Sequence, residues 1–163
     1  YLLLTTDKYP GVLVKLQRDP RKRHVATEME HESRIYNALG CRELVHQVIP
    51  MFYGYSSHLG VAMICIGQEL DDFDDIGVEN LSESLKKSAV RAVEVLSLVG
   101  VLHNDIALRN FVVSKANPNQ AKIIDFGRAS FSSDAELLAR QVETVKTILG
   151  MSLKNNDAIA VKV

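Results

Sequence analysis

The segment from Val101 to Ala129 constrains the fold most, because polar side chains stand at the ends of its short apolar runs. From residue 101 it reads VLHNDIALRN, and the apolar triplet Phe111–Val113 follows directly. A second apolar run, Ala121–Ile124, leads into Asp125-Phe126-Gly127. Short apolar runs separated by turn residues are typical of a β-hairpin. Such a hairpin would hold two carboxylates and an amide at a fixed separation.

Asp105, Asn110 and Asp125 are the polar residues that the predicted hairpin brings together. Phosphoryl transfer needs a carboxylate that orients the attacking hydroxyl, and an amide oxygen and a second carboxylate that hold magnesium against the phosphates. Mg²⁺ prefers a few hard oxygen ligands and retains several waters, so two protein ligands suffice. Asp105 is therefore the candidate base, and Asn110 and Asp125 are the candidate metal ligands. Gly127 would allow the sharp turn behind Asp125.

A lysine and a glutamate in the amino-terminal part form a second candidate pair. Lys15 ends a short apolar strand, and Glu32 lies seventeen residues later, within the apolar face of a helix predicted over Thr27–Leu39. A carboxylate that faces a core is costly unless it is paired. We therefore predict an ion pair between Lys15 and Glu32, with Glu28 and Glu30 as the alternative carboxylates.

The whole chain predicts the order hairpin, helix, hairpin, linker, helix, strand pair, helix. A glycine follows each predicted helix, and Ser82 is positioned to cap the second one. The elements not yet given are the strands Tyr1–Thr6, Val12–Gln17, Val48–Tyr55 and Leu59–Ile66, the basic loop Arg18–His24, a turn over Ser56–His58, the acidic linker Glu69–Asp75, the turn Asn117–Asn119, and the helices Ser82–Val99 and Asp134–Leu149.

This order predicts an α+β fold with two lobes. A small β-rich amino-terminal lobe with one helix would cover residues 1–67, and a linker would follow over 68–80. A helical carboxy-terminal lobe would cover 81–163. The cleft between the lobes is the expected place for a small ligand.

Composition excludes some classes of function. The 163 residues carry 19 basic and 20 acidic side chains, so the formal charge of −1 indicates neither nucleic acid nor an anionic membrane as a partner. The chain has no apolar run near the length of a membrane span and no visible signal peptide. Two cysteines are too few for a disulfide scaffold. The two cysteines do not report the compartment, so it stays unknown; a cytoplasmic protein is favoured, and a secreted effector is the alternative.

The motif His103-x-Asp105-x4-Asn110, followed by Asp125-Phe126-Gly127, resembles the catalytic loop and metal-binding motif of the protein-kinase-like superfamily. The resemblance covers roughly Val12 to Leu149 and is strongest toward small kinase-like proteins that are common in fungi. It implies a reduced two-lobed kinase-like fold that uses ATP and Mg²⁺, with a truncated helical lobe.

The resemblance also implies roles for individual residues. Asp105, Lys15 and Glu32 would be catalytic, and His103 would be architectural. The backbone of the segment Met63–Gly67 would hydrogen-bond the base, which leaves ATP and GTP undistinguished. The nucleotide and its metal would be bound by Lys15, Met63, Cys65, Asn110 and Asp125, with Asn110 and Asp125 on the metal.

Three departures from the family pattern bear on activity. No glycine-rich loop precedes Lys15, Asn104 stands where the family usually has arginine, and only about six residues separate Gly127 from the last predicted helix, with no Ala-Pro-Glu motif after it. A peptide would have little to lie on, which favours a small-molecule substrate or no catalysis. Arg109 would either contact the substrate or, as we favour, pair with a nearby acid.

Three hypotheses for function follow. The first is an ATP-dependent phosphotransferase that acts on a small molecule or an unidentified protein. The second is a pseudokinase-like binding module or effector, weakly active or inactive, that binds ATP or a protein partner. The third is that the chain, which starts at Tyr1, is part of a larger kinase.

Overall fold

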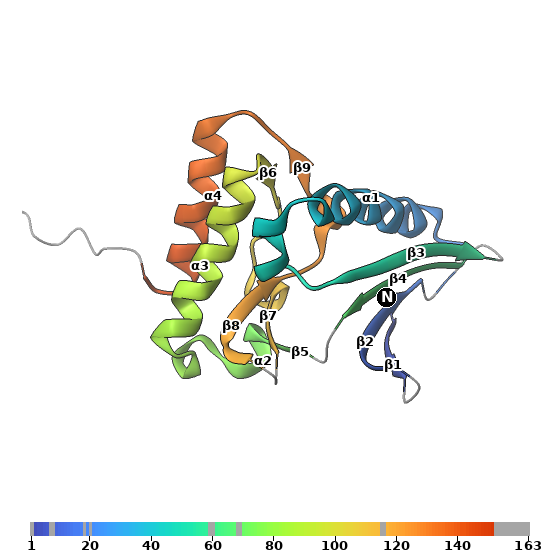
Figure 1. Cartoon of the computed structure of the whole chain (residues 1–163), viewed down its shortest axis with the longest axis horizontal. Helices are drawn as coiled ribbons and strands as arrows, with labels where there is room; N and C mark the ends of the chain where they lie inside the picture. Colours follow the sequence, from blue (N-terminus) through green and yellow to red (C-terminus); the bar gives the residue numbers. More distant parts are fainter. Residues whose placement is uncertain are drawn as a thin grey trace, which may run out of the picture.

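The computed structural model describes residues 2–6, 9–17, 19, 21–58, 61–67, 70–114 and 117–151. It is a mixed α and β structure with short strands and few helices, in agreement with the predicted class (Figure 1). The strands are β1 (Leu2–Thr6), β2 (Tyr9–Leu16), β3 (Phe52–His58), β4 (Val61–Gly67), β5 (Leu70–Asp72), β6 (Val101–Leu102), β7 (Phe111–Ser114), β8 (Asn117–Ile123) and β9 (Ser130–Phe131). The helices are α1 (Arg23–Gly40), α2 (Phe73–Ile76), α3 (Glu83–Leu98) and α4 (Ala135–Ile148), and the short 3-10 helices are η1 (Glu43–Gln47), η2 (Val78–Asn80), η3 (Leu108–Asn110) and η4 (Phe126–Arg128).

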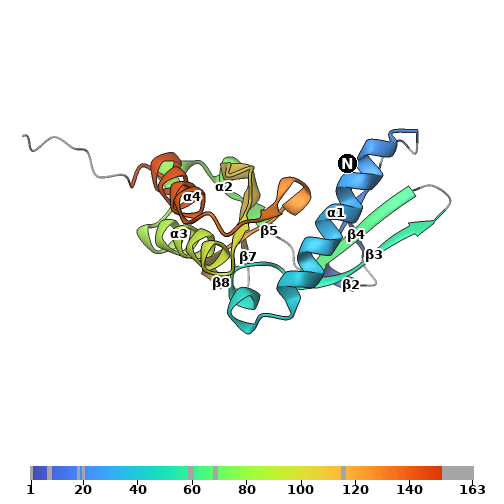
Figure 2. The same cartoon turned by 90° about the horizontal axis from the view of Figure 1, so that it is seen from above.

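The amino-terminal part forms an antiparallel sheet of four strands in the order β1-β2-β4-β3. Both predicted hairpins are present, because β1 pairs with β2 and β3 pairs with β4. Lys15 lies on the inner strand β2, opposite Leu3 on β1 and Ile64 on β4. Helix α1 lies along this sheet and contacts β3 and β4 (Figure 2). The face that it buries is Met29, Glu32, Ser33, Ile35, Tyr36 and Leu39.

The carboxy-terminal part is built on α3, which contacts both β8 and α4 (Figure 1). Strand β8 belongs to a second sheet in the order β5-β7-β8. The Ser82 hydroxyl accepts a hydrogen bond from the Leu85 N–H at 3.2 Å and caps α3 as predicted. Asp134 caps α4 by accepting from two backbone N–H groups. The predicted helices Ser82–Val99 and Asp134–Leu149 are therefore correct to within a residue at each end.

An aromatic cluster connects the two parts of the chain. The Tyr36 ring of α1 stacks on Phe52 with ring centroids 5.1 Å apart, and it meets Phe126 edge-on at 5.0 Å. A backbone hydrogen bond from the Ile123 N–H to the Val48 carbonyl, 2.8 Å long, joins β8 to the segment before β3. Together these contacts fix α1 against the chain that follows β8.

Two predicted turns are strand residues instead. Ser56–His58 lies in β3, where Ser57 pairs with Ala62. Asn117–Asn119 opens β8, where Asn117 pairs with Ser114. In both places pairing with a neighbouring strand outweighs the local preference of Ser, Asn and Pro for turns, because these residues lie on exposed ends of the sheets.

The predicted basic loop and acidic linker are also partly wrong. Helix α1 begins at Arg23, four residues before its predicted start, so the end of the basic loop is helical. The described part of the acidic linker contains β5, which pairs with β7, and the short helix α2. Phe73 explains why this segment forms regular structure, because its fully buried ring packs on Phe111 and anchors the segment.

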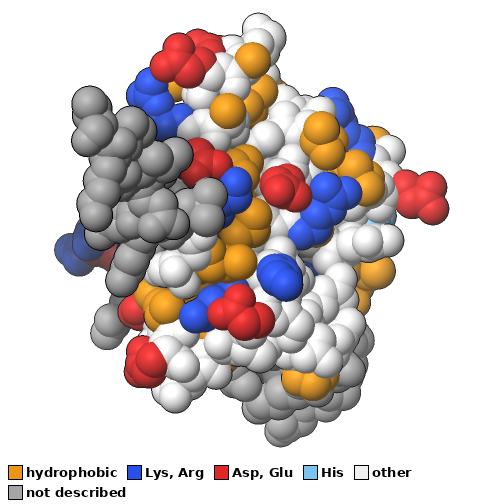
Figure 3. Space-filling model, turned by 90° about the vertical axis from the view of Figure 1, so that its left-hand side faces the viewer, with side chains coloured by type: hydrophobic (Ala, Val, Ile, Leu, Met, Phe, Trp, Pro, Cys, Tyr) orange, Lys and Arg blue, Asp and Glu red, His pale blue; other side chains and the backbone are white. Residues whose placement is uncertain are grey.

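The surface of α3 and α4 combines both signs of charge, as Figure 3 shows for the side of the molecule that they form. Several of these charges pair within one helix, namely Arg91–Glu94, Arg140–Glu136 and Lys146–Glu143. In the part of the chain that the structure describes, no helix has the length and apolar character needed to cross a membrane.

The buried Tyr36 hydroxyl yields a test of the aromatic cluster. This hydroxyl makes no well-aligned hydrogen bond among the described residues, although the Asp125 backbone lies close to it, and a poorly paired buried hydroxyl costs about 1–3 kcal/mol. Tyr36→Phe keeps the ring contacts, so we expect its free energy of unfolding in urea to equal or exceed that of the wild type by up to about 1 kcal/mol. Tyr36→Ala should lose about 3–5 kcal/mol. A Tyr36→Phe loss greater than 1 kcal/mol would contradict this account.

Candidate functional site

The Lys15 ammonium is the centre of the candidate site. Its Nζ donates to Glu32 Oε2 at 2.9 Å and to Asp125 Oδ1 at 2.8 Å. These three residues come from β2, from the buried face of α1 and from the end of β8. The structure therefore contains the predicted pair of Lys15 with Glu32, rather than with Glu28 or Glu30, and adds Asp125 to it.

Burial and mutual attraction act in opposite directions on these charges. Burial alone would lower the pKa of Lys15, but Glu32 and Asp125 together raise it above its usual value. Burial raises the pKa of Glu32 despite Lys15, because the Glu32 side chain is only 3% exposed. Burial also pushes the pKa of Asp125 upward, but Lys15 outweighs it and the pKa of this more exposed carboxyl is lowered. The cluster thus holds an ionised Asp125 beside a protonated lysine.

The backbone at Asp125 is in the left-handed region, with φ 66° and ψ 69°. This conformation is strained for a residue with a side chain and persists only where its surroundings enforce it. Here Lys15 holds the Asp125 carboxylate, and Glu32 Oε1 accepts from the next backbone N–H, that of Phe126, at 3.3 Å. The predicted need for glycine at Gly127 is wrong, because the left-handed residue of the turn is Asp125, Gly127 has no positive φ, and a Cβ there would stand at a contact distance of 3.4 Å from Asp125 Oδ1.

Asp105, Arg109 and Asn110 form the adjoining part of the site. Arg109 Nη2 donates to both carboxylate oxygens of Asp105 at 2.9 Å, which is the pairing favoured for this arginine. Asn110 Nδ2 donates to the Asp105 carbonyl at 2.8 Å and to its Oδ2 at 3.3 Å. The Asn110 carbonyl accepts from the Ile124 N–H at 2.9 Å, which ties this loop to the residue before Asp125.

Asn110 and Asp125 supply oxygens that suit Mg²⁺. Asn110 is buried and uses its amide nitrogen on Asp105, which leaves its Oδ1 as the amide atom available to a cation. Asp125 is ionised and partly exposed. Two such ligands fit a magnesium ion that phosphates and waters also coordinate. No cluster of three or more His, Cys, Asp or Glu suited to a metal occurs among the described residues.

A buried polar network that sequence reasoning missed supports this loop. The His103 N–H donates to Gln141 Oε1 at 3.1 Å, and Gln141 Nε2 donates to the Val101 carbonyl at 2.8 Å and to Ser97 Oγ at 2.9 Å. His103 Nε2 donates to the Ile124 carbonyl at 2.9 Å, so His103 positions the chain just before Asp125. The available signal was Gln141 itself, a polar residue on the buried face of α4.

Neutral hydrogen bonds hold the short segment after Gly127. Asn104, itself in the left-handed region with φ 61°, donates through Nδ2 to the Arg128 carbonyl and to Ser130 Oγ, both at 3.0 Å. His31 Nε2 on α1 donates to the Ala129 carbonyl at 2.7 Å. Asn104 thus fixes this segment through its amide.

Met63 and Cys65 were predicted as nucleotide contacts, and both lie on β4. Cys65 pairs with Val14 on β2, so this strand runs beside the strand that carries Lys15. Their side chains lie outside what the structure describes, so their proposed contacts with a nucleotide stay predictions.

The depth of Glu32 predicts the effect of breaking the ion cluster. We expect Lys15→Met to reduce the free energy of unfolding by about 3 kcal/mol, because Glu32 stays buried without its cation. Adding Glu32→Gln should restore at least about 1 kcal/mol of this loss. Urea unfolding measures both values. Arg21→Met is the control, since it breaks the exposed Arg21–Asp19 pair and should cost less than about 0.5 kcal/mol. If Lys15→Met and Arg21→Met lost the same free energy of unfolding, the account would be refuted.

His103 predicts a pH dependence near neutrality. Burial lowers the pKa of His103 in the folded protein, so near pH 6.5 the unfolded chain binds the additional proton. The stability that this neutral histidine contributes is present above about pH 6.5 and is lost as the pH falls, with a slope of up to about 1.4 kcal/mol per pH unit. His103→Gln keeps a donor for the Ile124 carbonyl and should flatten the slope between pH 7.5 and 5.5. An unchanged slope in this variant would assign it to other groups.

Comparison with known proteins gives a distant relative. No protein-family model matches the chain. The chain is similar to the probable serine/threonine-protein kinase 2 of Plasmodium falciparum (isolate K1 / Thailand), with 27% identity over 118 residues. The match covers 67% of this chain and 23% of the Plasmodium protein, so the chain spans less than a quarter of that relative. This similarity supports a distant kinase-like relationship.

Proposed function

We propose that the chain is a phosphotransferase that binds Mg–ATP in a reduced, two-lobed kinase-like fold. The lobes would cover residues 1–67 and 81–163, and the linker 68–80 would form the hinge. The observation that carries the proposal is the Lys15 ammonium held between Glu32 and Asp125 at 2.9 and 2.8 Å. A cation, its positioning carboxylate and a metal-binding carboxylate then meet at one point, next to Asn110 and Asp105.

Each residue has a role in this proposal. The Lys15 ammonium, held by Glu32 and Asp125, would interact with the phosphates of the nucleotide as their positive counter-charge. Asn110 and Asp125 would hold Mg²⁺, which would neutralise negative charge on the phosphates. Asp105 would accept the proton of the substrate hydroxyl as the phosphoryl group is transferred. Glu32 would hold Lys15 in place.

The segment after Gly127 favours a small-molecule substrate. It returns to the protein within a few residues, because β9 pairs with β6 and Asp134 then caps α4. Asn104 and His31 hold its backbone. An extended peptide would therefore find little surface here, while a compact hydroxyl compound could reach Asp105, whose side chain is 21% exposed.

The bond between Arg109 and Asp105 supports a second candidate function. Both oxygens of the proposed base accept from Arg109, which would weaken proton transfer and suit a pseudokinase-like module that binds ATP or a protein partner. The two functions differ in the fate of ATP. Slow release of ADP would indicate a phosphotransferase, and binding without any release would indicate the module. Arg109→Ala should accelerate release if the arginine restrains the base.

Nucleotide binding is tested first by thermal unfolding with 1 mM Mg–ATP or Mg–GTP. A dissociation constant near 10 μM would add about 2.7 kcal/mol of stability, and each kcal/mol corresponds to about 2–4 °C for a domain of this size. We expect a magnesium-dependent increase that is lost in Asp125→Asn and kept in Asp74→Asn, which changes an exposed acid on α2. Absence of any shift at millimolar nucleotide would overturn the proposal.

The proposed base is tested separately from binding. Asp105→Asn should keep the thermal shift with Mg–ATP, because Lys15, Asn110 and Asp125 remain. It should lower the rate of ADP release by at least about 100-fold, the usual contribution of a general base. A coupled assay for ADP measures this rate. Equal rates in Asp105→Asn and the wild type would remove Asp105 from the chemistry.

A further inference from the structure

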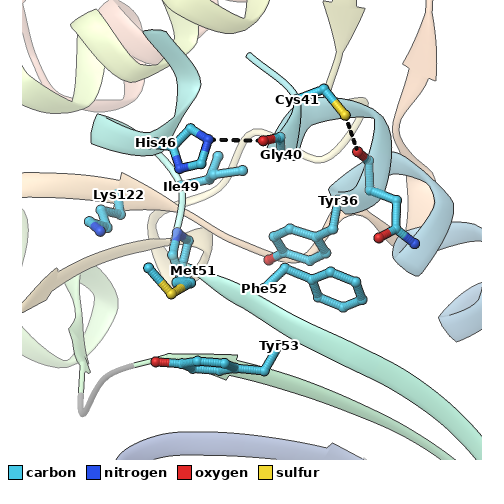
Figure 4. Close-up of a pocket in the computed structure, with 11 residues that line it drawn as sticks. Tyr36, Gly40, Cys41, His46, Ile49, Met51, Phe52, Tyr53 and Lys122 are labelled. Carbon is cyan, nitrogen blue, oxygen red and sulfur yellow. Dashed lines mark hydrogen bonds between the residues drawn. The ribbon is translucent and has the colours of Figure 1, made fainter. Parts of the chain in front are cut away.

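A cavity of about 460 Å³ opens at the carboxyl end of α1. This volume is within the range of sites for small molecules. The walls come from the last turns of α1, from η1, from the start of β3 and from β8 (Figure 4). Lys15, Glu32, Asp105, Asn110 and Asp125 do not line it, so it is separate from the candidate nucleotide site. Its lining includes Tyr36, Cys41, His46, Met51, Tyr53 and Lys122.

Lys122 is the charged group of this cavity. It lies on β8 and is partly buried, and burial alone lowers the pKa of its ammonium. Among the residues that the structure describes, its ammonium makes no ion pair or hydrogen bond. A partly desolvated ammonium without an anion is unfavourable, and an anionic ligand would relieve this. Lys146 differs, since it pairs with Glu143 at 2.7 Å.

The rest of the cavity is suited to a flat apolar body. Tyr36 and Phe52 form one wall as a stacked pair whose ring planes differ by 5°. Met51 and Tyr53 are 60% and 59% exposed, so two large apolar side chains stand at the opening without cover from the protein. Aromatic and thioether side chains of this kind pack well on planar ring systems.

The end of α1 determines which way a ligand would lie. Helix carboxyl ends carry partial negative charge and disfavour anions. At this end Gly40 presents a carbonyl that already accepts from His46 Nε2 at 2.9 Å, and the Cys41 thiol donates to the Asn37 carbonyl at 3.6 Å. Figure 4 shows Cys41 and Lys122 at opposite ends of the cavity. An anionic head would therefore lie at Lys122, and the apolar body would extend toward α1.

From this arrangement we propose that the cavity is a second ligand site, for a small aromatic carboxylate that pairs with Lys122 and packs between Phe52, Met51 and Tyr53. The proposal does not depend on nucleotide binding. Phe52 stacks on the buried Tyr36, and Tyr36 contacts Phe126, the residue after Asp125, so an occupied cavity would lie one ring away from the contact that supports the candidate nucleotide site.

The test uses 2-naphthoate and its neutral counterpart 2-naphthamide, each titrated by calorimetry at pH 7. We expect the acid to bind at least tenfold more tightly than the amide. Lys122→Met keeps the length of the side chain and should abolish this preference. Lys87→Met changes an exposed lysine of α3 outside the cavity and should keep it. Equal affinity for acid and amide, binding of neither, or a preference that survives in Lys122→Met would overturn the proposal.

A second measurement locates the bound acid. The exposed thiol of Cys41 lines the cavity, so 2-naphthoate should slow its alkylation by iodoacetamide several-fold, measured by mass spectrometry on the peptide that contains it. Binding of the acid without protection of Cys41 would place it elsewhere and overturn the proposal. Asp125→Asn should keep both the affinity and the protection, so a failure of nucleotide binding is distinguishable from a failure of this site.

Discussion

The buried contact of Lys15 with Glu32 and Asp125 is the interaction on which the rest of the site depends. It joins β2, α1 and the end of β8, and Asp125 lies 110 residues from Lys15 along the chain. Removing Lys15 leaves two carboxylates without a cation, and the cost is greatest at Glu32 because its side chain is almost fully buried. The cluster therefore makes the conformation at Asp125 conditional on the correct placement of α1.

Helix α1 acts on Asp125 through two side chains one turn apart. Glu32 accepts from the Phe126 N–H, and Tyr36 meets the Phe126 ring edge-on at 5.0 Å. The backbone and the side chain of the same residue are thus fixed by one helix face. A shift of α1 would release the left-handed conformation of Asp125, which is unfavourable without this support. The backbone conformation of Asp125, the candidate metal ligand, therefore depends on the position of α1.

Local patterns in the sequence predicted some features and missed others for physical reasons. The ion pair of Lys15 with Glu32 was predictable, because a carboxylate on an apolar helix face needs a partner. The third member, Asp125, was not predictable as a partner of Lys15, because only the folded chain brings these ends together. The prediction of a polar turn over Asn117–Asn119 was wrong, because pairing with β7 outweighed the local preference of Asn and Pro for turns. Gln141 was overlooked although it is a polar residue on the buried face of α4, and its contacts with His103 and Val101 give the reason for its burial.

The short segment between Gly127 and α4 is held in place by hydrogen bonds from other parts of the chain. The Asn104 amide donates to the Arg128 carbonyl and to the Ser130 hydroxyl, both at 3.0 Å. An amide needs no phosphate as a counterion, and its hydrogen bonds do not weaken with salt as exposed ion pairs do. His31 adds a bond from α1 to the Ala129 carbonyl. The same helix that fixes Asp125 through Glu32 therefore also fixes the segment that follows, through the hydrogen bond of His31.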